Sequence, residues 1–352
     1  MSKQETSAQD LLSVPGVRVA AVASHIRYAN RLDLVLIELA QGSTVAGVFT
    51  LNAFCAAPVH IARKHLLTSG GVGENLPIAK IAAGVPIAFA ALGEDWQNTA
   101  KGIMTTDTVP KARSVKIEIG GKSVVITGIA KGAGMIKPNM ATMLSYVFTD
   151  AKIEQKTLHG LLSRVVDQSF NRITVDGDTS TNDCCVLSAT GHSGVDIQAS
   201  DAAGFVAFEE ALQSLVKELA KDIIRDAEGA KKFVTVDIKG GGNTDECLKV
   251  AYAISESPLV KTALSASDPN WGRILAAIGR AGVPELDVSK ISIYLGKVCI
   301  VSNGTLAPSY TEAQGQAEMS KPEIEVTVDL ARGQTRETVW TSDLSEEYVR
   351  IN

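Results

Sequence analysis

The chain has 352 residues, of which 45% are hydrophobic and 21% charged, as in a globular protein with one large or two to three smaller domains. A net charge of −5 argues against nucleic acid as a partner, and the longest apolar run, residues 85–92, is far shorter than a membrane span. The five cysteines and five histidines show no metal-ligand spacing, and the N-terminus has no secretory or transit pattern. We therefore expect a cytoplasmic protein without metal, membrane or nucleic-acid partners.

Apolar periodicity predicts secondary structure along the chain. The first half is predicted to contain strands at 17–22, 34–39 and 46–51, a helix at 76–91, a hairpin of strands 115–119 and 124–126, and a buried strand at 143–148. The second half is predicted to contain helices at 158–170, 205–223, 259–264 and 274–280, a strand at 233–238, a short apolar run at 248–253, and a hairpin-rich end with strands at 291–295, 298–301, 324–330 and 337–340. Helices interleaved with hairpins indicate an α+β fold with mostly antiparallel sheets.

Residues 131–144, KGAGMIKPNMATML, are the stretch most suggestive of chemistry. Two glycines, a proline and an asparagine allow a sharp turn and a close approach of the backbone to a ligand. The stretch then enters the predicted buried strand, with Thr142 at the junction and the small Ala141 before it. Taken alone, it is more typical of a glycine-rich loop followed by an ordinary strand threonine.

A threonine hydroxyl needs a base before it can act as a nucleophile. The threonine's own α-amine supplies one when the threonine is the first residue of a chain, because an α-amine titrates near pH ~8. An internal threonine reaches that position when its hydroxyl attacks the preceding carbonyl and the resulting ester is hydrolysed. Thr142 after Ala141 suits this chemistry, although spacing alone does not require it.

Four further segments decide between these interpretations. They are residues 103–108 (IMTTDT), the dense polar run within 169–183 (SFNRITVDGDTSTND), residues 268–274 (DPNWGRI) and the terminal YVRIN. Together with 131–144, and in the same order along the chain, they resemble the ornithine/glutamate N-acetyltransferase family of ArgJ type. By itself the polar run 171–183 is either a solvated loop or the lining of a site.

The resemblance implies a layered αββα fold of the N-terminal-nucleophile-like (DOM) type, and a chain that cuts itself between Ala141 and Thr142. Residues 1–141 would form an alpha chain and residues 142–352 a beta chain, assembled as an α2β2 heterotetramer. Thr142 would take the acetyl group from N2-acetylornithine and pass it to glutamate, in arginine biosynthesis. Some members also accept acetyl-CoA as a substrate, and the resemblance leaves this open. No bound cofactor is implied.

The same resemblance assigns further site residues. Lys131, Glu228 and Asn352 match substrate-contacting positions, and Thr105 or its neighbour Thr106 matches a substrate-contacting threonine. A cation at Lys131 suits a substrate carboxylate, and a carboxylate at Glu228 suits an amino group of ornithine. The plainer interpretations are a loop lysine, a surface glutamate and a turn threonine.

The oxyanion hole is expected at Ser69 and Gly70, where the family has a Thr-Gly pair. Serine keeps the hydroxyl and backbone N–H that such a site requires. Two departures from the family pattern affect this expectation. The strand, loop and helix that members carry just before this pair are missing, which is expected to leave apolar faces uncovered, and the chain stops at Asn352, a few residues early.

Two alternatives remain at this stage. An amidohydrolase or aminopeptidase of the same N-terminal-nucleophile type would use Thr142 with water as the acceptor. An inactive shortened homologue would stay as one uncut chain.

Overall fold

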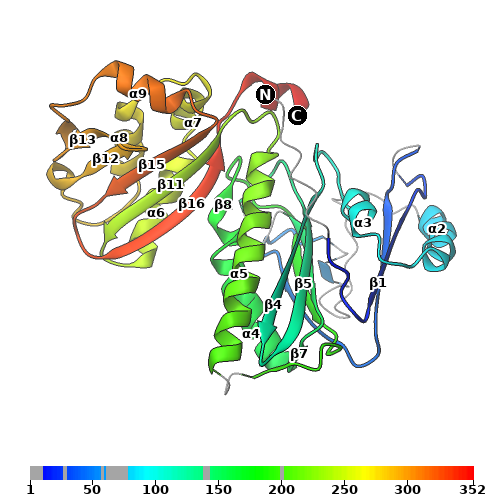
Figure 1. Cartoon of the computed structure of the whole chain (residues 1–352). Helices are drawn as coiled ribbons and strands as arrows, with labels where there is room; N and C mark the ends of the chain where they lie inside the picture. Colours follow the sequence, from blue (N-terminus) through cyan, green and yellow to red (C-terminus); the bar gives the residue numbers. More distant parts are fainter. Residues whose placement is uncertain (1–10, 27–29, 57–58, 61–77, 138–142, 199–201) are drawn as a thin grey trace. The chain divides into compact units, whose positions relative to one another are not determined.

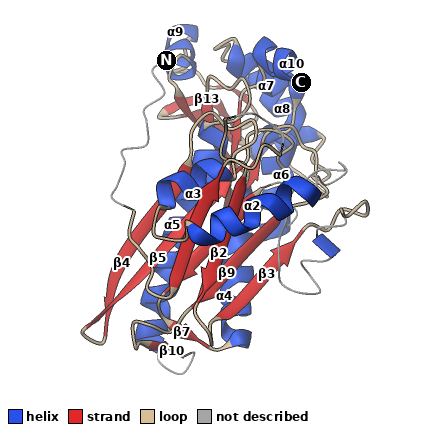
Figure 2. Ribbon diagram, turned by 90° about the vertical axis from the view of Figure 1, so that its right-hand side faces the viewer, coloured by secondary structure: helices blue, strands red, loops and turns tan. Residues whose placement is uncertain are grey.

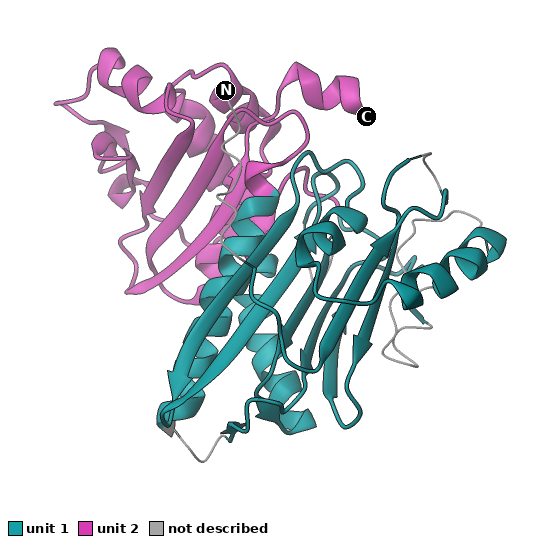
Figure 3. Cartoon of the chain, turned by 45° about the vertical axis from the view of Figure 1, so that its right-hand side comes forward, with its two compact units in different colours: residues 1–171, 179–223 teal, residues 172–178, 224–352 magenta. Residues whose placement is uncertain are grey.

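We describe a computed structural model, in which residues 11–26, 30–56, 59–60, 78–137, 143–198 and 202–352 are defined. These residues form two compact units (Figure 3), unit 1 from residues 1–171 and 179–223 and unit 2 from residues 172–178 and 224–352. No helix within the defined ranges combines the length and apolar character needed to cross a membrane.

Unit 1 is built on a five-stranded sheet (Figure 2). Its strand order is β3 (Thr44–Phe49), β9 (Cys184–Ala189), β6 (Leu144–Thr149), β5 (Lys122–Lys131) and β4 (Lys111–Ile119). β6 and β9 are parallel, and the other neighbours are antiparallel. β6 therefore lies in the middle of the sheet, between a strand that precedes it and one that follows it in the chain. Unit 1 also contains a separate two-stranded parallel sheet, formed by β7 (Lys152–Ile153) and β10 (Asp196–Ile197).

Two helices, α4 (Gln155–Asp167) and α5 (Ala202–Arg225), cover one face of this sheet (Figure 1). α5 approaches β5 at Gly128, where a Cβ atom would come within 2.9 Å of both Leu215 Cδ2 and Leu219 Cδ1. The Arg113 guanidinium on β4 donates to both carboxylate oxygens of Asp222 on α5, at 2.7 and 2.9 Å. The missing side chain at Gly128 and this ion pair together fix α5 against the sheet.

The opposite face carries a second, two-stranded sheet of β1 (Val17–Val22) and β2 (Leu34–Leu39). A core that includes Val19, Trp96, Ile129 and Phe148 joins the two sheets, with α3 (Trp96–Gly102) contributing its tryptophan. α2 (Ile78–Ala90) packs on β1 and β2 from outside, with Gly84 directly over Ser24 and Leu34. The order helix, sheet, sheet, helix confirms the layered αββα prediction for unit 1.

Unit 2 contains a seven-stranded sheet. Its strand order is β14 (Thr305–Leu306), β13 (Val298–Ser302), β12 (Ser292–Leu295), β15 (Glu323–Asp329), β11 (Phe233–Gly241), β16 (Thr335–Ser342) and β8 (Ile173–Thr174). The defined helices of this unit are α6 (Thr244–Ser255), α7 (Pro258–Ser265), α8 (Trp271–Gly279), α9 (Glu312–Met319), α10 (Glu346–Ile351) and the short η2 (Val288–Lys290). Val236, Val250, Ile254, Ile293 and Val326 lie in one buried core between the sheet and these helices.

Three sequence predictions need correction. Strand β3 ends at Phe49 rather than 51, and Leu51 is largely exposed. The run 248–253 belongs to a full helix, α6, which begins after the Asn243 side chain accepts a hydrogen bond from Glu246 N at 2.9 Å. β15 and β16 do not form a hairpin, because β11 pairs with both and lies between them.

Exposed apolar side chains gather on α2. Ile78, Val85, Ile87 and Phe89 are all exposed, although α2 belongs to a layered unit. An uncovered apolar surface of this kind is what the resemblance predicts if the chain lacks the strand and helix expected before residue 69.

Candidate active site

Four strands of unit 1 meet in one row at one end of the sheet. Lys131 pairs with Leu144, Leu144 with Cys184, and Cys184 with Phe49. The row continues one residue further, because Cys184 N donates to Met143 O at 3.1 Å. The end of β5, the starts of β6 and β9 and the end of β3 therefore share one sheet edge, which we call the nucleophile edge.

The segment after Lys131 turns sharply at this edge. Gly132 has a φ of 155° and its N–H donates to Asp107 Oδ1 at 2.7 Å. Met135 has a positive φ of 49°, and the Thr179 hydroxyl donates to Lys137 O at 3.2 Å. The part of the predicted turn that the structure describes, residues 131–137, is thus held by hydrogen bonds at Gly132 and Lys137.

Asp107 is a buried carboxylate that connects the predicted substrate contact Thr105 with Gly132, the residue after Lys131. Its Oδ1 also accepts from Lys111 Nζ at 2.6 Å, and its Oδ2 accepts from Thr105 N at 3.0 Å. Burial by itself would raise the pKa of Asp107, but the charge and hydrogen bond of Lys111 and the N–H groups of Thr105 and Gly132 outweigh it. The pKa therefore lies below its ordinary value, and the carboxylate holds Thr105 near the turn that follows Lys131.

The polar run 171–183 is largely buried rather than solvated. Its last part is fastened to the residues after β3, since Thr50 N donates to Asp183 O at 3.0 Å and the Thr50 hydroxyl donates to Ser180 O at 2.8 Å. Asn182 and Asp183 are both buried beside the nucleophile edge. Burial raises the pKa of Asp183 to about 8, although a hydrogen bond from Ser180 and the charge of Lys131 favour the ionised form.

In unit 2 the structure brings two predicted contacts together across 124 residues of sequence. The Asn352 side-chain amide donates to Glu228 Oε2 at 2.9 Å. α10 is anchored nearby, because the Ser345 hydroxyl donates to Gly229 O at 2.7 Å and the Tyr348 hydroxyl donates to Asp176 Oδ2 at 3.1 Å. Glu228 and Asn352 thus form one polar pair within this unit.

Four predicted site residues, Ser69, Gly70, Ala141 and Thr142, lie outside the described residues. Thr105 and Thr106 are both exposed, and Lys131 is partly buried. The roles of all these residues remain predictions.

Sequence reasoning missed two buried carboxylates of unit 1 that lie near the nucleophile edge. Asp107 and Asp183 stood inside polar runs that were noted only as wholes. The spacing of Lys111 four residues after Asp107 is a signal for an ion pair. Asp183 has no comparable local signal, because the residues around it are determined by the register between β6 and β9.

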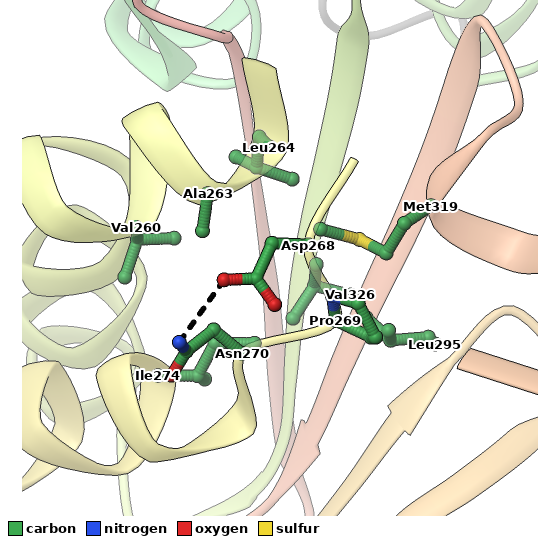
Figure 4. A pocket seen from close by; sticks show the side chains of 10 residues that line it. All are labelled: Val260, Ala263, Leu264, Asp268, Pro269, Asn270, Ile274, Leu295, Met319 and Val326. Atoms are coloured by element: carbon green, nitrogen blue, oxygen red, sulfur yellow. Dashed lines mark hydrogen bonds between the residues drawn. The ribbon is translucent and has the colours of Figure 1, made fainter. Parts of the chain in front are cut away.

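A small pocket in unit 2 contains part of the DPNWGRI motif (Figure 4). It is lined by Val260, Ala263, Leu264, Asp268, Pro269, Asn270, Ile274, Leu295, Met319 and Val326. The Asn270 amide donates to Asp268 Oδ2 at 3.1 Å, and its oxygen accepts from Arg273 N at 3.3 Å. The motif residues therefore cap the start of α8, which accounts for them structurally.

Comparison with known proteins places this geometry in a family. The sequence model of the ArgJ family matches residues 66–352, well over half of the chain. The chain belongs to the ArgJ family.

Two curated relatives of this ArgJ-family chain are similar over nearly their full lengths. The arginine biosynthesis bifunctional protein ArgJ of Pseudomonas fluorescens (strain Pf0-1) is 48% identical over 387 residues, covering 96% of this chain and 96% of the relative. The protein of the same name from Psychrobacter arcticus is 45% identical over 393 residues, covering 98% and 97%. The first alignment exceeds the 352 residues of the chain by 35, so at least 35 aligned positions fall in gaps of this chain.

A solved structure is also similar. The crystal structure of the arginine biosynthesis bifunctional protein ArgJ from Bacillus halodurans aligns with a TM-score of 0.57 and 38% identity. The match covers 60% of this chain and 99% of that one.

Proposed function

We propose that this ArgJ-family protein transfers the acetyl group of N2-acetyl-L-ornithine to L-glutamate in arginine biosynthesis, with Thr142 as the nucleophile. The names and near-complete coverage of its relatives support the pathway. The observation that carries the mechanism is the nucleophile edge, where β6 begins at Leu144, directly after the proposed cleavage site and beside Lys131 and Asp183.

The proposed reaction has two half-reactions. The Thr142 hydroxyl attacks the acetyl carbonyl of N2-acetylornithine, and the α-amine of Thr142 takes the hydroxyl proton. The C–N bond to ornithine breaks, and the departing nitrogen receives that proton. The glutamate amine then attacks the acetyl ester on Thr142, which restores the hydroxyl and gives N-acetylglutamate. Ser69 and Gly70 are the proposed donors to the oxyanion.

The charges of the proposed contacts suit amino-acid substrates. Lys131 would bind a substrate carboxylate, and Thr105 is held near it through Asp107. Glu228 would bind an amino group of ornithine, and the Asn352 amide orients its carboxylate. Acetyl-CoA as a second donor belongs to the same proposal.

Self-cleavage between Ala141 and Thr142 is part of the proposal. Residues 1–141 would form the alpha chain and residues 142–352 the beta chain. An α2β2 heterotetramer is the proposed assembly of the two pieces.

An acylation experiment tests the proposed function. The purified protein, mixed with N2-acetylornithine alone, should release one burst of ornithine, and the fragment that begins at Thr142 should gain the mass of one acetyl group. Turnover should then require glutamate, and Thr142→Ala should give neither burst nor adduct. Release of free acetate at a rate independent of glutamate would instead indicate the amidohydrolase, and a folded wild-type chain without cleavage or adduct would indicate an inactive homologue.

A further inference from the structure

Glu228 lies at the tip of a tight turn that follows α5. Ala230 N donates to Ala227 O at 3.0 Å and closes the turn. Its two central residues are Glu228 and Gly229. Gly229 has a φ of 66°, a positive value that favours glycine at this position of a turn. The direction of the Glu228 side chain is therefore determined by the geometry of this turn.

The chain just before α10 holds this turn by its backbone. The Ser345 hydroxyl donates to Gly229 O at 2.7 Å. Asp343 Oδ1 accepts from both Lys231 N and Lys232 N, at 2.8 and 2.9 Å. Asp343 and Ser345 are both buried, at 3% and 7% exposure. One buried carboxylate and one buried hydroxyl thus fix the turn at its second central residue and directly after it.

The hydroxyl of Ser345 is used in an unusual way. Ser345 is the N-cap residue of α10, a position at which a serine side chain normally accepts a hydrogen bond from the helix. Within α10, all of whose residues the structure describes, no backbone N–H donates to this hydroxyl, which donates to Gly229 O instead. The contact is also close, because a Cβ atom on Gly229 would lie 2.4 Å from Tyr348 N. Both features favour the contact between α10 and the turn over the stability of α10 alone.

The charges around Glu228 suit a substrate amine. The Asn352 amide that donates to Glu228 is neutral, so it leaves the negative charge of the carboxylate in place. Burial raises the pKa of Tyr348 to about 12, and the negative charge of Asp176 acts in the same direction. Glu228 and Asp178 contribute to the same shift. Among the residues that the structure describes, no lysine or arginine forms an ion pair with Glu228, so a cationic amine would supply the missing positive charge.

We propose that Ser345 is a positioning residue for Glu228, and that it thereby sets the preference for an acetyl donor with a side-chain amine. The assignment rests on the proposed function, in which Glu228 binds that amine. Because Ser345 holds the turn by its backbone, the carboxylate is in place before the donor binds, and less conformational freedom is lost on binding. Glutamate has no side-chain amine, so the preference acts in the first half-reaction.

Two acetyl donors that differ only in the side-chain amine test the assignment. They are N2-acetyl-L-ornithine and N2-acetyl-L-norvaline, in which a hydrogen replaces that amine. The value of kcat/KM is measured for each donor from the release of its amino acid, with glutamate as acceptor. In Ser345→Ala, kcat/KM for acetylornithine should fall by about 5-fold or more, whereas that for acetylnorvaline should change by less than about twofold.

Three further variants separate positioning from a general loss of structure. Glu228→Gln should show a selective loss at least as large, and adding Ser345→Ala to it should cause little further loss, because both act through one contact. Ser345→Thr keeps the hydroxyl and should retain the wild-type preference. Thr311→Ala is the matched control, because it removes the hydroxyl of another N-cap residue in unit 2, at the start of α9. It should leave kcat/KM for both donors unchanged.

Folding of every variant is checked by circular dichroism and thermal melting. If Ser345→Ala does not fold, Ser345→Cys takes its place, since a thiol is similar in size but a weak donor. Equal losses for the two donors, or the full wild-type preference in the folded variant, would overturn the assignment and leave acetyl transfer intact. A folded wild-type protein that releases no ornithine from N2-acetylornithine would overturn the proposed function, and the assignment with it.

Discussion

At the scale of single residues, the buried ion pair of Asp107 and Lys111 is the feature on which the arrangement of Thr105 and Gly132 depends. Both side chains are almost fully inaccessible, at 0% and 1% exposure. Removing one partner of a buried pair leaves an uncompensated charge. The pair therefore has a structural consequence that can be measured apart from activity.

Lys111→Met should lower the free energy of unfolding by about 3–5 kcal/mol at neutral pH. The wild-type pair stabilises the fold above the unfolded pKa of Asp107, and this stabilisation is lost as the pH falls through its lowered folded pKa. The difference between variant and wild type should therefore shrink on acidification. Urea unfolding at roughly pH 7 and at roughly pH 2.5, which is below the unfolded Asp pKa near ~3.9, measures it. The exposed pair of Lys152 with Asp196 supplies the control, since Lys152→Met should cost less than about 1 kcal/mol. Equal losses in the two variants would contradict the prediction.

Lys261 in unit 2 predicts a second pH dependence of stability, at alkaline rather than acidic pH. It is 2% exposed and donates to Thr341 Oγ1 at 2.8 Å, and burial lowers its pKa to about 8. Between this value and the unfolded pKa near ~10.4 the unfolded chain binds more protons, so stability should rise with pH, by an amount on the order of 3 kcal/mol. Urea unfolding between roughly pH 8 and pH 10 should show this rise in wild type and in Lys249→Met, an exposed lysine, but not in Lys261→Met. If the stability of Lys261→Met rose with pH as steeply as that of the wild type, the prediction would be refuted.

The residue scale also shows where sequence reasoning stops. Lys131 and Thr105 were found through the resemblance, but their connection through Asp107 depends on how β5 ends beside residues 105–107. Asp183 was visible only as one member of a polar run, because the parallel register of β6 and β9 is not encoded in any local pattern.

At the scale of elements, local periodicity predicted strands and helices well where one face is buried. β1 and β2 have the predicted bounds, Val17–Val22 and Leu34–Leu39. Local periodicity could not predict which strands pair when they lie far apart in the sequence. β11 separates β15 from β16 although it precedes them by about eighty residues, so the adjacency of two apolar segments in sequence was mistaken for a hairpin.

The contact of α5 with β5 makes a prediction at this scale. Gly128→Ala should destabilise unit 1 by about 1–3 kcal/mol, because the new Cβ meets Leu215 and Leu219 at 2.9 Å. Gly160→Ala on α4 is the control, since its nearest neighbour is the mobile end of Arg164 at 3.4 Å. That change should stabilise by about 0.5–1 kcal/mol through helix propensity. Thermal melting measures both, and a neutral Gly128→Ala would show that α5 does not pack this closely.

At the scale of the whole molecule, the proposed fragments are interleaved in one sheet. Residues 1–141 supply β3, β4 and β5, and residues 142–352 supply β6 and β9, in the order β3, β9, β6, β5, β4. Each fragment therefore depends on the other for its backbone hydrogen bonds. Size-exclusion chromatography should keep the cut fragments together in native buffer and separate them only in denaturant. Fragments that elute apart without denaturant would contradict this arrangement.

The central claim is that the peptide bond between Ala141 and Thr142 breaks by the chemistry of the folded chain. Intact mass spectrometry of the purified wild-type protein and Thr142→Ala, both verified as folded, tests it most directly. The wild type should give two species, residues 1–141 and residues 142–352, and Thr142→Ala a single uncut chain. A folded wild-type protein that remains one chain, or a larger fragment that does not begin at Thr142, would contradict the account.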